Sequence, residues 1–150
     1  MNARRADGPA AVVMIEDDAG HADLLRMAWQ EAGVPDGLTI VDTGDAALDL
    51  LGVGSTRRTP HLPRLILVDL NLPGRDGREI LVAIRSDERF ANVPVVIMST
   101  STSPEDRSTT QRAGADDYVV KPHRFAQLVT AVSDIAARWL TTETQPAHPR

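Results

Sequence analysis

Charged side chains directly follow three short apolar runs of the sequence. Glu16, Asp17 and Asp18 come after the first run, Asp69 after the second and Lys121 after the third. Short runs rich in β-branched residues are typical of buried parallel strands, and an open α/β sheet binds ligands at the carboxyl ends of its strands. Four carboxylates and one ammonium at that edge would be electrostatically unstable without a cation. The pattern therefore favours a site that holds a divalent metal together with a phosphate.

Each of these residues also has a simpler structural interpretation. The acids at positions 16–18 could cap the next helix, and Lys121 could be a solvated strand-end lysine whose bond to Pro122 is a candidate cis peptide. Ser99 follows a further apolar run and could merely begin a serine-rich turn. Asp69 resists such an explanation, because it ends the most apolar stretch of the chain, where an uncompensated charge would cost several kcal/mol. Four strands that each present a suitable group at one edge favour the functional interpretation.

Strand and helix patterns alternate regularly and would position these residues. The sequence predicts strands over residues 11–15, 38–41, 64–69, 94–98 and 117–120, and helices over residues 21–32, 45–51, 76–86, 103–114 and 123–140. Five strands alternating with five helices predict the α/β class, as a single doubly wound parallel sheet. We expect this domain to span residues 11–140, between an N-terminal tail over residues 1–10 and a polar C-terminal tail over residues 141–150.

Composition and charge narrow the class of protein. A chain of 150 residues, 42% of them hydrophobic and 25% charged, is typical of one globular domain. The net charge of −5 argues against a nucleic acid partner, which would need a basic face. No apolar run approaches the ~20 residues of a membrane span and residues 1–10 lack the core of a signal peptide, so we expect a cytoplasmic protein without a membrane partner. The absence of cysteine excludes disulfides and thiol chemistry.

The order of these motifs resembles the receiver domain of response regulators in two-component signalling, from about residue 12 to residue 140. The matching features, in family order, are the acidic pair Glu16–Asp17, the Asp69 turn with Pro73 and Gly77, the Ser99 hydroxyl, Tyr118 and the Lys121–Pro122 pair. Lys121 follows Ser99 by 22 residues, which is the gap expected of such domains. The resemblance implies the receiver fold, which is flavodoxin-like.

The resemblance implies that Mg²⁺ is the cofactor. Asp17 and Asp69 would bind the ion directly, the backbone carbonyl of Asn71 would join them, and Glu16 would act through a water molecule. Mg²⁺ prefers such oxygen ligands and keeps several waters. Asp18 would remain a helix cap. Crowding of these carboxylates without a cation is expected to raise the pKa of at least one of them.

The resemblance also implies a phosphoacceptor switch rather than an enzyme. Asp69 would accept a phosphoryl group from a histidine of a sensor kinase, and Lys121 and the Ser99 hydroxyl would hold the phosphoryl oxygens. Catalysis would then consist of positioning and charge neutralisation. Ser99 and Tyr118 would couple the site to the face made by the fourth helix, the fifth strand and the fifth helix.

Some residues depart from the commonest receiver pattern. Thr100 stands where many receivers have a small residue, and His123 replaces the usual Phe or Leu after the Lys-Pro pair. Both would lie near the rim of the site, where they could change access and the lifetime of the phosphate. The stretches 72–81 and 135–140 are similar to stand-alone regulators that partner bacterial phytochrome-type histidine kinases, so such a kinase is the expected partner.

Three other classes of protein share part of the pattern. A haloacid dehalogenase phosphatase would need a second Asp two residues after the first, but position 71 is Asn. A flavodoxin-like FMN protein would carry its serine-rich loop after the first strand, whereas residues 99–103 follow the fourth, and aromatic residues to sandwich a flavin are missing. A transcription factor would need a second domain, and only about ten residues follow the last helix. We therefore expect the signal to leave by protein–protein contact.

Large apolar residues near the end of the chain indicate the form of that contact. Trp139 and Leu140 have little chain after them to cover them, and exposed apolar patches usually mark interfaces. We expect a homodimer through the face made by the fourth helix, the fifth strand and the fifth helix, to which the last helix contributes these two side chains. The alternative is that Trp139 packs back on its own domain, against the first helix or the N-terminal segment.

Overall fold

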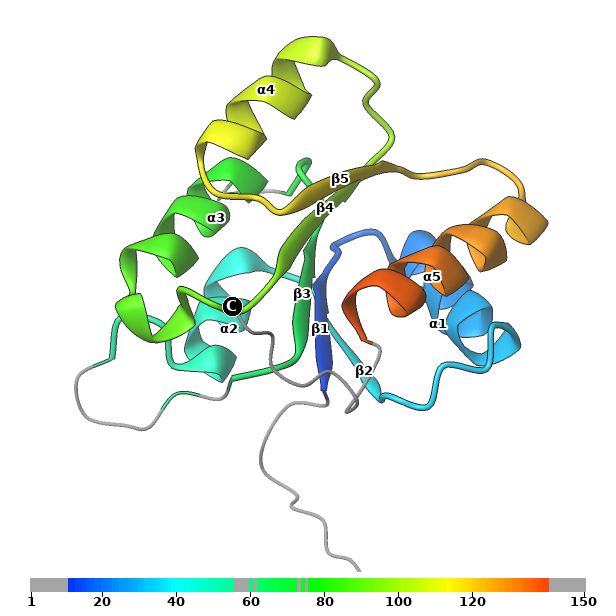
Figure 1. The fold of residues 1–150 in the computed structure, drawn as a ribbon, viewed down its shortest axis with the longest axis horizontal. Helices are drawn as coiled ribbons and strands as arrows, with labels where there is room; N and C mark the ends of the chain where they lie inside the picture. Colours follow the sequence, from blue (N-terminus) through cyan, green and yellow to red (C-terminus); the bar gives the residue numbers. More distant parts are fainter. Residues whose placement is uncertain (1–10, 56–59, 61, 73, 75, 141–150) are drawn as a thin grey trace, which may run out of the picture.

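A parallel sheet of five strands forms the centre of the molecule (Figure 1). This computed structural model describes residues 11–55, 60, 62–72, 74 and 76–140. The strands are β1 (Val12–Ile15), β2 (Leu38–Val41), β3 (Leu65–Val68), β4 (Val95–Ser99) and β5 (Asp117–Val120), in the spatial order β2-β1-β3-β4-β5. The α/β class and all five predicted strands are confirmed. The two predicted tails and Pro73 lie outside the described residues.

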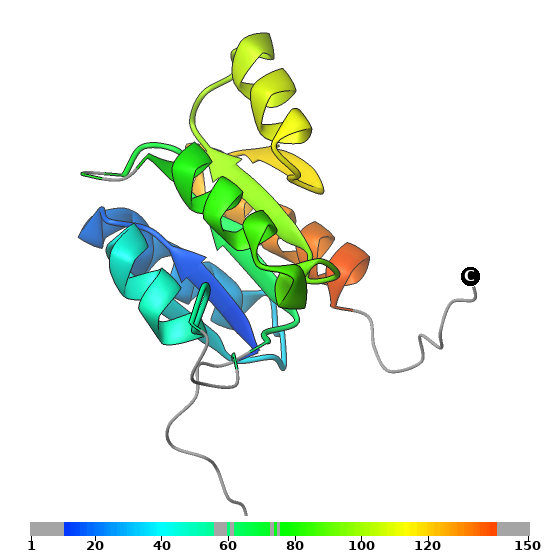
Figure 2. The ribbon, with the colours of Figure 1, turned by 90° about the vertical axis from the view of Figure 1, so that its left-hand side faces the viewer.

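Helices cover both faces of the sheet, as Figures 1 and 2 show together. One face carries α1 (Ala19–Glu31) and α5 (Phe125–Trp139), and the other carries α2 (Gly44–Leu51), α3 (Gly77–Ser86) and α4 (Pro104–Arg112). A short 3-10 helix over Glu88–Phe90, which the sequence pattern does not reveal, precedes β4. Each face has its own apolar cluster, one beneath α2 and α3 and one beneath α1 and α5.

The central strands are deeply buried because helices cover them on both sides. The residues of β1 and β3 have no exposed surface, whereas those of the edge strand β2 are half-buried. Val13 and Ile15 belong to the cluster beneath α2 and α3, while Val12 and Met14 belong to the cluster beneath α1 and α5. Both side-chain directions must therefore be apolar, which is why continuous apolar runs predict these strands.

Side-chain caps determine where most helices begin. Asp18 caps α1, because its carboxylate accepts a hydrogen bond from the backbone N–H of His21 at 2.9 Å, as predicted for this residue. Asp76 and Glu79 form a reciprocal capping box at the start of α3, and Ser103 caps α4 through its hydroxyl. With Asp18 as its cap, α1 begins two residues before the predicted start at His21.

Arg64 ties together both ends of the described chain at the amino edge of the sheet. Its backbone N–H donates to the carbonyl of Ala11 at 2.7 Å. Its guanidinium donates to the carbonyl of Leu140 at 3.1 Å and to the carboxylate of Asp36 at 2.5 Å. The carbonyl of Asp36 in turn accepts from the indole N–H of Trp29 at 2.8 Å. The end of α5 is therefore held close to the strand starts.

Leu140 is buried, so the prediction that it lies exposed in a dimer interface is wrong. Only 6% of its surface is exposed, and it packs in the cluster beneath α1 and α5. Trp139 is half-buried against the same cluster, which agrees with the alternative that it packs back on its own domain. The physical reason is the bond from Arg64 to the Leu140 carbonyl, which holds the end of the helix against the sheet.

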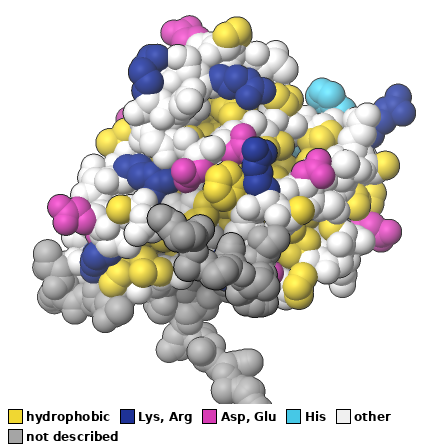
Figure 3. All heavy atoms as spheres, viewed as in Figure 1, with side chains coloured by type: hydrophobic (Ala, Val, Ile, Leu, Met, Phe, Trp, Pro, Cys, Tyr) yellow, Lys and Arg dark blue, Asp and Glu magenta, His cyan; other side chains and the backbone are white. Residues whose placement is uncertain are grey.

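The surface carries charges of both signs. On the face shown in Figure 3, acidic side chains lie among basic ones, and neither sign gathers into a continuous region. This mixture agrees with a net charge of −5 spread over 16 basic and 21 acidic residues. Among the helices in the described part of the chain, none is both long and apolar enough to cross a membrane.

Candidate functional site

The register of the sheet brings two of the predicted acids to one edge. Ile15 pairs with Val68 across β1 and β3, so Glu16 and Asp69 leave the sheet side by side. The backbone N–H of Asp69 donates to the carbonyl of Ile15 at 3.1 Å, which continues the ladder for one more residue. Both acids therefore follow directly from strand ends, as their sequence context predicts.

The same edge carries the predicted hydroxyl and ammonium groups. Ser99 pairs with Val120 at the ends of β4 and β5, and the backbone N–H of Lys121 donates to the carbonyl of Ser99 at 2.7 Å. The bond between Lys121 and Pro122 is trans, so the expected cis candidate is wrong. Strands β1, β3, β4 and β5 thus all present their functional groups at one edge.

Three carboxylates at this edge form a cluster suited to a cation. Glu16, Asp17 and Asp69 each offer one oxygen, and these oxygens lie within 4.8 Å of one another. Glu16 and Asp69 are only 2% and 5% exposed, whereas Asp17 is exposed. The cluster is therefore open to solvent on one side, so an ion can enter with some of its waters. A donor set made only of oxygen fits Mg²⁺.

Lys121 bridges the two buried carboxylates. Its ammonium donates to Asp69 Oδ2 at 3.2 Å and to Glu16 Oε1 at 2.5 Å, and the sequence does not predict that Glu16 is the closer partner. The second Glu16 oxygen accepts from the backbone N–H of Asp18 at 3.1 Å. Both oxygens of Glu16 are therefore engaged by donors of the protein itself.

The pKa of Glu16 is raised above its ordinary value of 4.5, as expected for one carboxylate of a crowded site. Burial is the main cause, because it disfavours the charged form. The hydrogen bond and the charge of Lys121 act in the opposite direction, and the negative charge of Asp69 makes the smallest contribution to the rise. Desolvation, more than repulsion between the acids, therefore governs this group.

His21 is a neighbour of the site that sequence reasoning misses. Its Nδ1 lies 3.3 Å from the Lys121 ammonium and 4.0 Å from Glu16 Oε2, and about half of its side chain is exposed. The signal for it lies in Asp18, because an N-cap there puts position 21 in the first turn of α1, directly beyond β1. The sequence pattern predicts that the helix starts at His21, and this start does not reveal that the residue lies beside the end of β1.

The loop after Asp69 turns tightly back against the start of α3. The N–H of Asn71 donates to Asp69 Oδ1 at 3.1 Å, and the N–H of Gly77 donates to the carbonyl of Leu70 at 3.1 Å. A Cβ at position 77 would lie 2.4 Å from the carbonyl oxygen of Asp69 and 2.8 Å from Cα of Leu70, so a glycine is required there. The backbone of Asn71 is thus next to the Asp69 carboxylate, while the role of its carbonyl as a metal ligand stays a prediction.

Ser99 and Tyr118, the predicted switch pair, share one loop residue as a partner. Ser99 has no exposed surface, and its Oγ accepts from the backbone N–H of Ser101 at 3.1 Å. The hydroxyl of Tyr118 donates to the carbonyl of Ser101 at 2.9 Å, and the guanidinium of Arg107 lies 4.9 Å from the centre of the tyrosine ring. A movement of Ser99 can therefore reach Tyr118 through Ser101, although the switch itself stays a prediction.

A pocket of about 110 Å³ opens beside the site, between α1 and the start of α5. Glu16 and Lys121 line one side of it, and most of the remaining walls are apolar. Thr100 and His123, the two departures from the receiver pattern, are exposed and also line this pocket. Their predicted position at the rim of the site is therefore confirmed.

Comparisons with known sequences agree with this geometry. The family model described as the response regulator receiver domain matches residues 12–133. The chain is 35% identical over 143 residues to the probable methanogenesis regulatory protein FilR2 of Methanothrix harundinacea, with 94% of this chain and 90% of that protein covered. It is 30% identical over 139 residues to the response regulator Rcp1 of Synechocystis, with 93% and 95% covered.

Solved structures give the same result. The crystal structure of the Mn²⁺-bound form of Rcp1 is similar with a TM-score of 0.76 and 31% identity, over 93% of this chain and 100% of that chain. The phosphorylated cyanobacterial phytochrome response regulator RcpA is similar with a TM-score of 0.77 and 33% identity, over 91% and 97% of the two chains. Sequence, fold and the acidic edge of the sheet agree, and the chain belongs to the response regulator receiver domain family of two-component signalling.

Proposed function

We propose that Asp69 accepts a phosphoryl group from a histidine of a sensor kinase. The observation that carries this proposal is the position of its carboxylate, which is 5% exposed, belongs to the acidic cluster and accepts a hydrogen bond from the Lys121 ammonium. Lys121 donates to one carboxylate oxygen and the N–H of Asn71 to the other, so the group is held in one orientation. An oriented carboxylate oxygen is suited to form a bond to phosphorus as the P–N bond of a phosphohistidine breaks.

Mg²⁺ is the cofactor that these residues fit. We infer that Asp17 and Asp69 bind it directly, together with the carbonyl of Asn71, and that Glu16 acts through a water. Both Glu16 oxygens already accept hydrogen bonds, one from Lys121 and one from a backbone N–H, which supports the indirect role. The relative Rcp1 has been solved in a Mn²⁺-bound form. When bound, the ion supplies neutralisation of phosphoryl charge.

Lys121 and Ser99 are the residues that would hold the phosphoryl oxygens. The ammonium of Lys121 lies 3.2 Å from Asp69, and Ser99 ends the strand beside β3. Receiver domains are signalling switches rather than enzymes, so the chemistry of this chain would be limited to its own phosphorylation and dephosphorylation. Ser99 and Tyr118 would pass the phosphorylated state on through Ser101.

An apolar surface near the site supports a protein partner at this edge. Leu24 and Met27 of α1 and Phe125 of α5 are 44%, 55% and 38% exposed, and α1 and α5 lie side by side (Figure 1). Exposed apolar side chains on neighbouring elements often mark a site where another protein binds. Because the relative RcpA is a phytochrome response regulator, we propose that the partner kinase here is also phytochrome-type.

Labelling tests the central proposal. With Mg²⁺ and a radioactive acyl phosphate, the wild type and the control Asp134→Asn, an exposed aspartate of α5, should both take up label. Asp69→Asn should take up none while keeping its circular dichroism spectrum. An Asp69→Asn variant that is labelled as strongly as the wild type would overturn the assignment. Transfer from a phytochrome-type kinase, compared with a histidine kinase of another class, tests the partner.

We also propose a homodimer through the end of α5. The side chain of Trp139 is only half-buried, so part of it stays exposed at the end of α5. Two such rings, related by a two-fold axis, would cover each other's exposed part. Trp139→Ala removes the ring, so it should weaken a dimer measured by sedimentation with beryllofluoride. A wild type that is monomeric at every concentration, with and without beryllofluoride, would contradict this proposal.

A further inference from the structure

Ser101 is the meeting point of four hydrogen bonds in the loop between β4 and α4. Its backbone N–H donates to Ser99 Oγ at 3.1 Å, and its carbonyl accepts from the Tyr118 hydroxyl at 2.9 Å. Its own hydroxyl donates to Asp106 Oδ2 at 2.6 Å and accepts from the backbone N–H of Ser103 at 3.1 Å. The residue that contacts the Ser99 hydroxyl is thus itself fixed in position by groups of α4 and β5.

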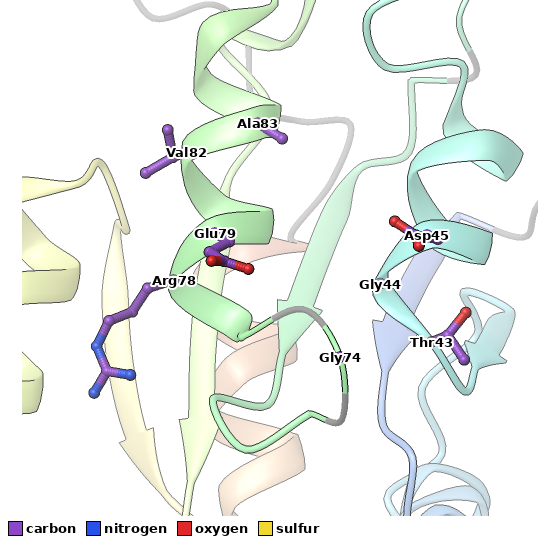
Figure 4. Close-up of a pocket in the computed structure, with 8 residues that line it drawn as sticks. All are labelled: Thr43, Gly44, Asp45, Gly74, Arg78, Glu79, Val82 and Ala83. Atoms are coloured by element: carbon purple, nitrogen blue, oxygen red, sulfur yellow. The ribbon is translucent and has the colours of Figure 1, made fainter.

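Asp106 is in turn anchored from α3. One nitrogen of the Arg78 guanidinium donates to Asp106 Oδ1, and another donates to both oxygens of Asp76 at 3.1 Å. Arg78 lines an open groove of about 950 Å³ between α2 and α3, but Figure 4 shows its side chain extending away from α2. Its contact with Asp106 therefore joins the start of α3 to the first turn of α4.

The charge state of Asp106 allows it to accept hydrogen bonds from both Ser101 and Arg78. The hydrogen bond from Ser101 is the largest contribution that lowers the pKa of Asp106, and the hydrogen bond and charge of Arg78 add to it. The carboxylate therefore stays ionised at neutral pH and keeps both partners. About a quarter of its side chain is exposed, so the chain of contacts is partly shielded from water.

The fixed position of Ser101 also orients the hydroxyl of Ser99. Because Ser99 Oγ accepts the N–H of Ser101, one of its lone pairs is occupied and its own hydrogen is left to point elsewhere. The hydrogen of the hydroxyl is therefore free to be donated to a phosphoryl oxygen. Ser99 has no exposed surface, so no competing water from bulk solvent sets its direction.

We propose that Asp106, anchored by Arg78, is a positioning residue for the phosphoryl group on Asp69, and that it acts through Ser101 on the Ser99 hydroxyl. This inference rests on the proposed role of Ser99 and deepens it. Asp106 touches neither the metal cluster nor the acceptor carboxylate. Its removal should therefore weaken the hold on a phosphoryl group and leave the binding of Mg²⁺ alone unchanged.

The test measures the affinity of the whole chain for beryllofluoride, a phosphoryl analogue, in saturating Mg²⁺. Asp106→Ala should bind it about three- to tenfold more weakly, which is the effect of losing one hydrogen bond. Asp106→Asn keeps an acceptor for the Ser101 hydroxyl and should recover most of the affinity. Glu105→Ala, which removes the same charge from the same helical turn at an exposed position, should bind like the wild type.

A double-mutant cycle with Ser99→Ala separates a positioning role from a general structural one. If Asp106 acts through Ser99, Asp106→Ala should have no further effect in the Ser99→Ala background. The same loss in both backgrounds, or an unchanged affinity of Asp106→Ala, would overturn the inference. If Asp106→Ala does not fold, Arg78→Gln takes its place in the cycle, with a smaller loss of about twofold expected.

Different results would contradict the proposed function and the proposed role of Asp106. A wild type that does not bind beryllofluoride, or a Ser99→Ala variant that binds it as tightly as the wild type, contradicts the proposed function. Normal binding by the wild type and weakened binding by Ser99→Ala, together with no effect of Asp106→Ala, contradicts only the inference on Asp106.

Discussion

Gly77→Ala should displace the phosphoacceptor loop, because the start of α3 lies in backbone contact with it. The added Cβ would lie 2.4 Å from the carbonyl oxygen of Asp69 and 2.8 Å from Cα of Leu70, whereas ordinary contact begins near 3.4 Å. Both contacts are with backbone atoms, which cannot rotate away as a side chain can. The helix and the loop must therefore separate by about 1 Å.

The size of the effect follows from this displacement. Overpacking of this kind costs about 1–3 kcal/mol, and the better helix propensity of alanine returns less than about 1 kcal/mol. We expect the free energy of unfolding to fall by about 1–2 kcal/mol. Asp69 moves with the loop, so phosphorylation should slow by on the order of 10–100-fold, the usual effect of misplacing a reacting group by this distance.

Urea unfolding and phosphorylation by acetyl phosphate with Mg²⁺ measure the two effects. Gly20→Ala in α1 is the matched control, because its Cβ would meet only the end of the Asp18 side chain, at 3.2 Å. The control should unfold within about 1 kcal/mol of the wild type and be phosphorylated at a normal rate. A Gly77→Ala variant with normal stability and a normal rate would refute the argument from contact.

Four further substitutions, at Asp17, Glu16, Lys121 and Arg85, each have a measurable outcome. Mg²⁺ should raise the melting temperature of the wild type, and Asp17→Ala should lose most of that gain; equal gains would remove Asp17 from the metal site. Because burial raises the pKa of Glu16, its contribution to metal-free stability is present below pH 4.5 and is lost as the pH rises through the raised pKa. Glu16→Gln should flatten that part of a pH series of urea unfolding, and an unchanged slope would contradict the assignment. Lys121→Ala should still be labelled by acyl phosphate, but beryllofluoride should no longer shift the amide resonances of α4; a normal shift would argue against signal transfer through this lysine. Arg85 donates four hydrogen bonds that join α3 to the loops before β4 and β5, so Arg85→Ala should cost about 2–4 kcal/mol of unfolding free energy, whereas the exposed Arg112→Ala should cost less than about 1.

The strands and the edge they share were predictable for a physical reason. A strand covered on both faces must be apolar at every position, so β1 and β3 stand out as continuous runs in the sequence. Charged groups that follow such runs directly can only lie at the carboxyl edge. Glu16, Asp69 and Lys121 could therefore be placed together from the sequence, without knowledge of any contact.

Contacts between side chains of different elements could not be predicted in this way. The position of Lys121 after an apolar run places it at the edge of the sheet. That position does not reveal that its ammonium lies closer to Glu16, at 2.5 Å, than to Asp69, at 3.2 Å. The apolar stripe of α5 is the same whether or not its last turn is held to the sheet. Arg64 decides that question for Leu140 from 76 residues earlier in the chain, and nothing in the local pattern reveals it.

The bonds of Arg64 have a practical consequence for engineering. Ala11 and Leu140 both bind this one residue, so these two positions of the backbone are close in space and lie opposite the acidic edge. A short peptide that joins them would close the domain into a ring with little strain, and a circular permutant opened at an exposed loop should fold. A fluorescent reporter or a surface anchor attached beside either position would leave the approach of a kinase to Asp69 unobstructed.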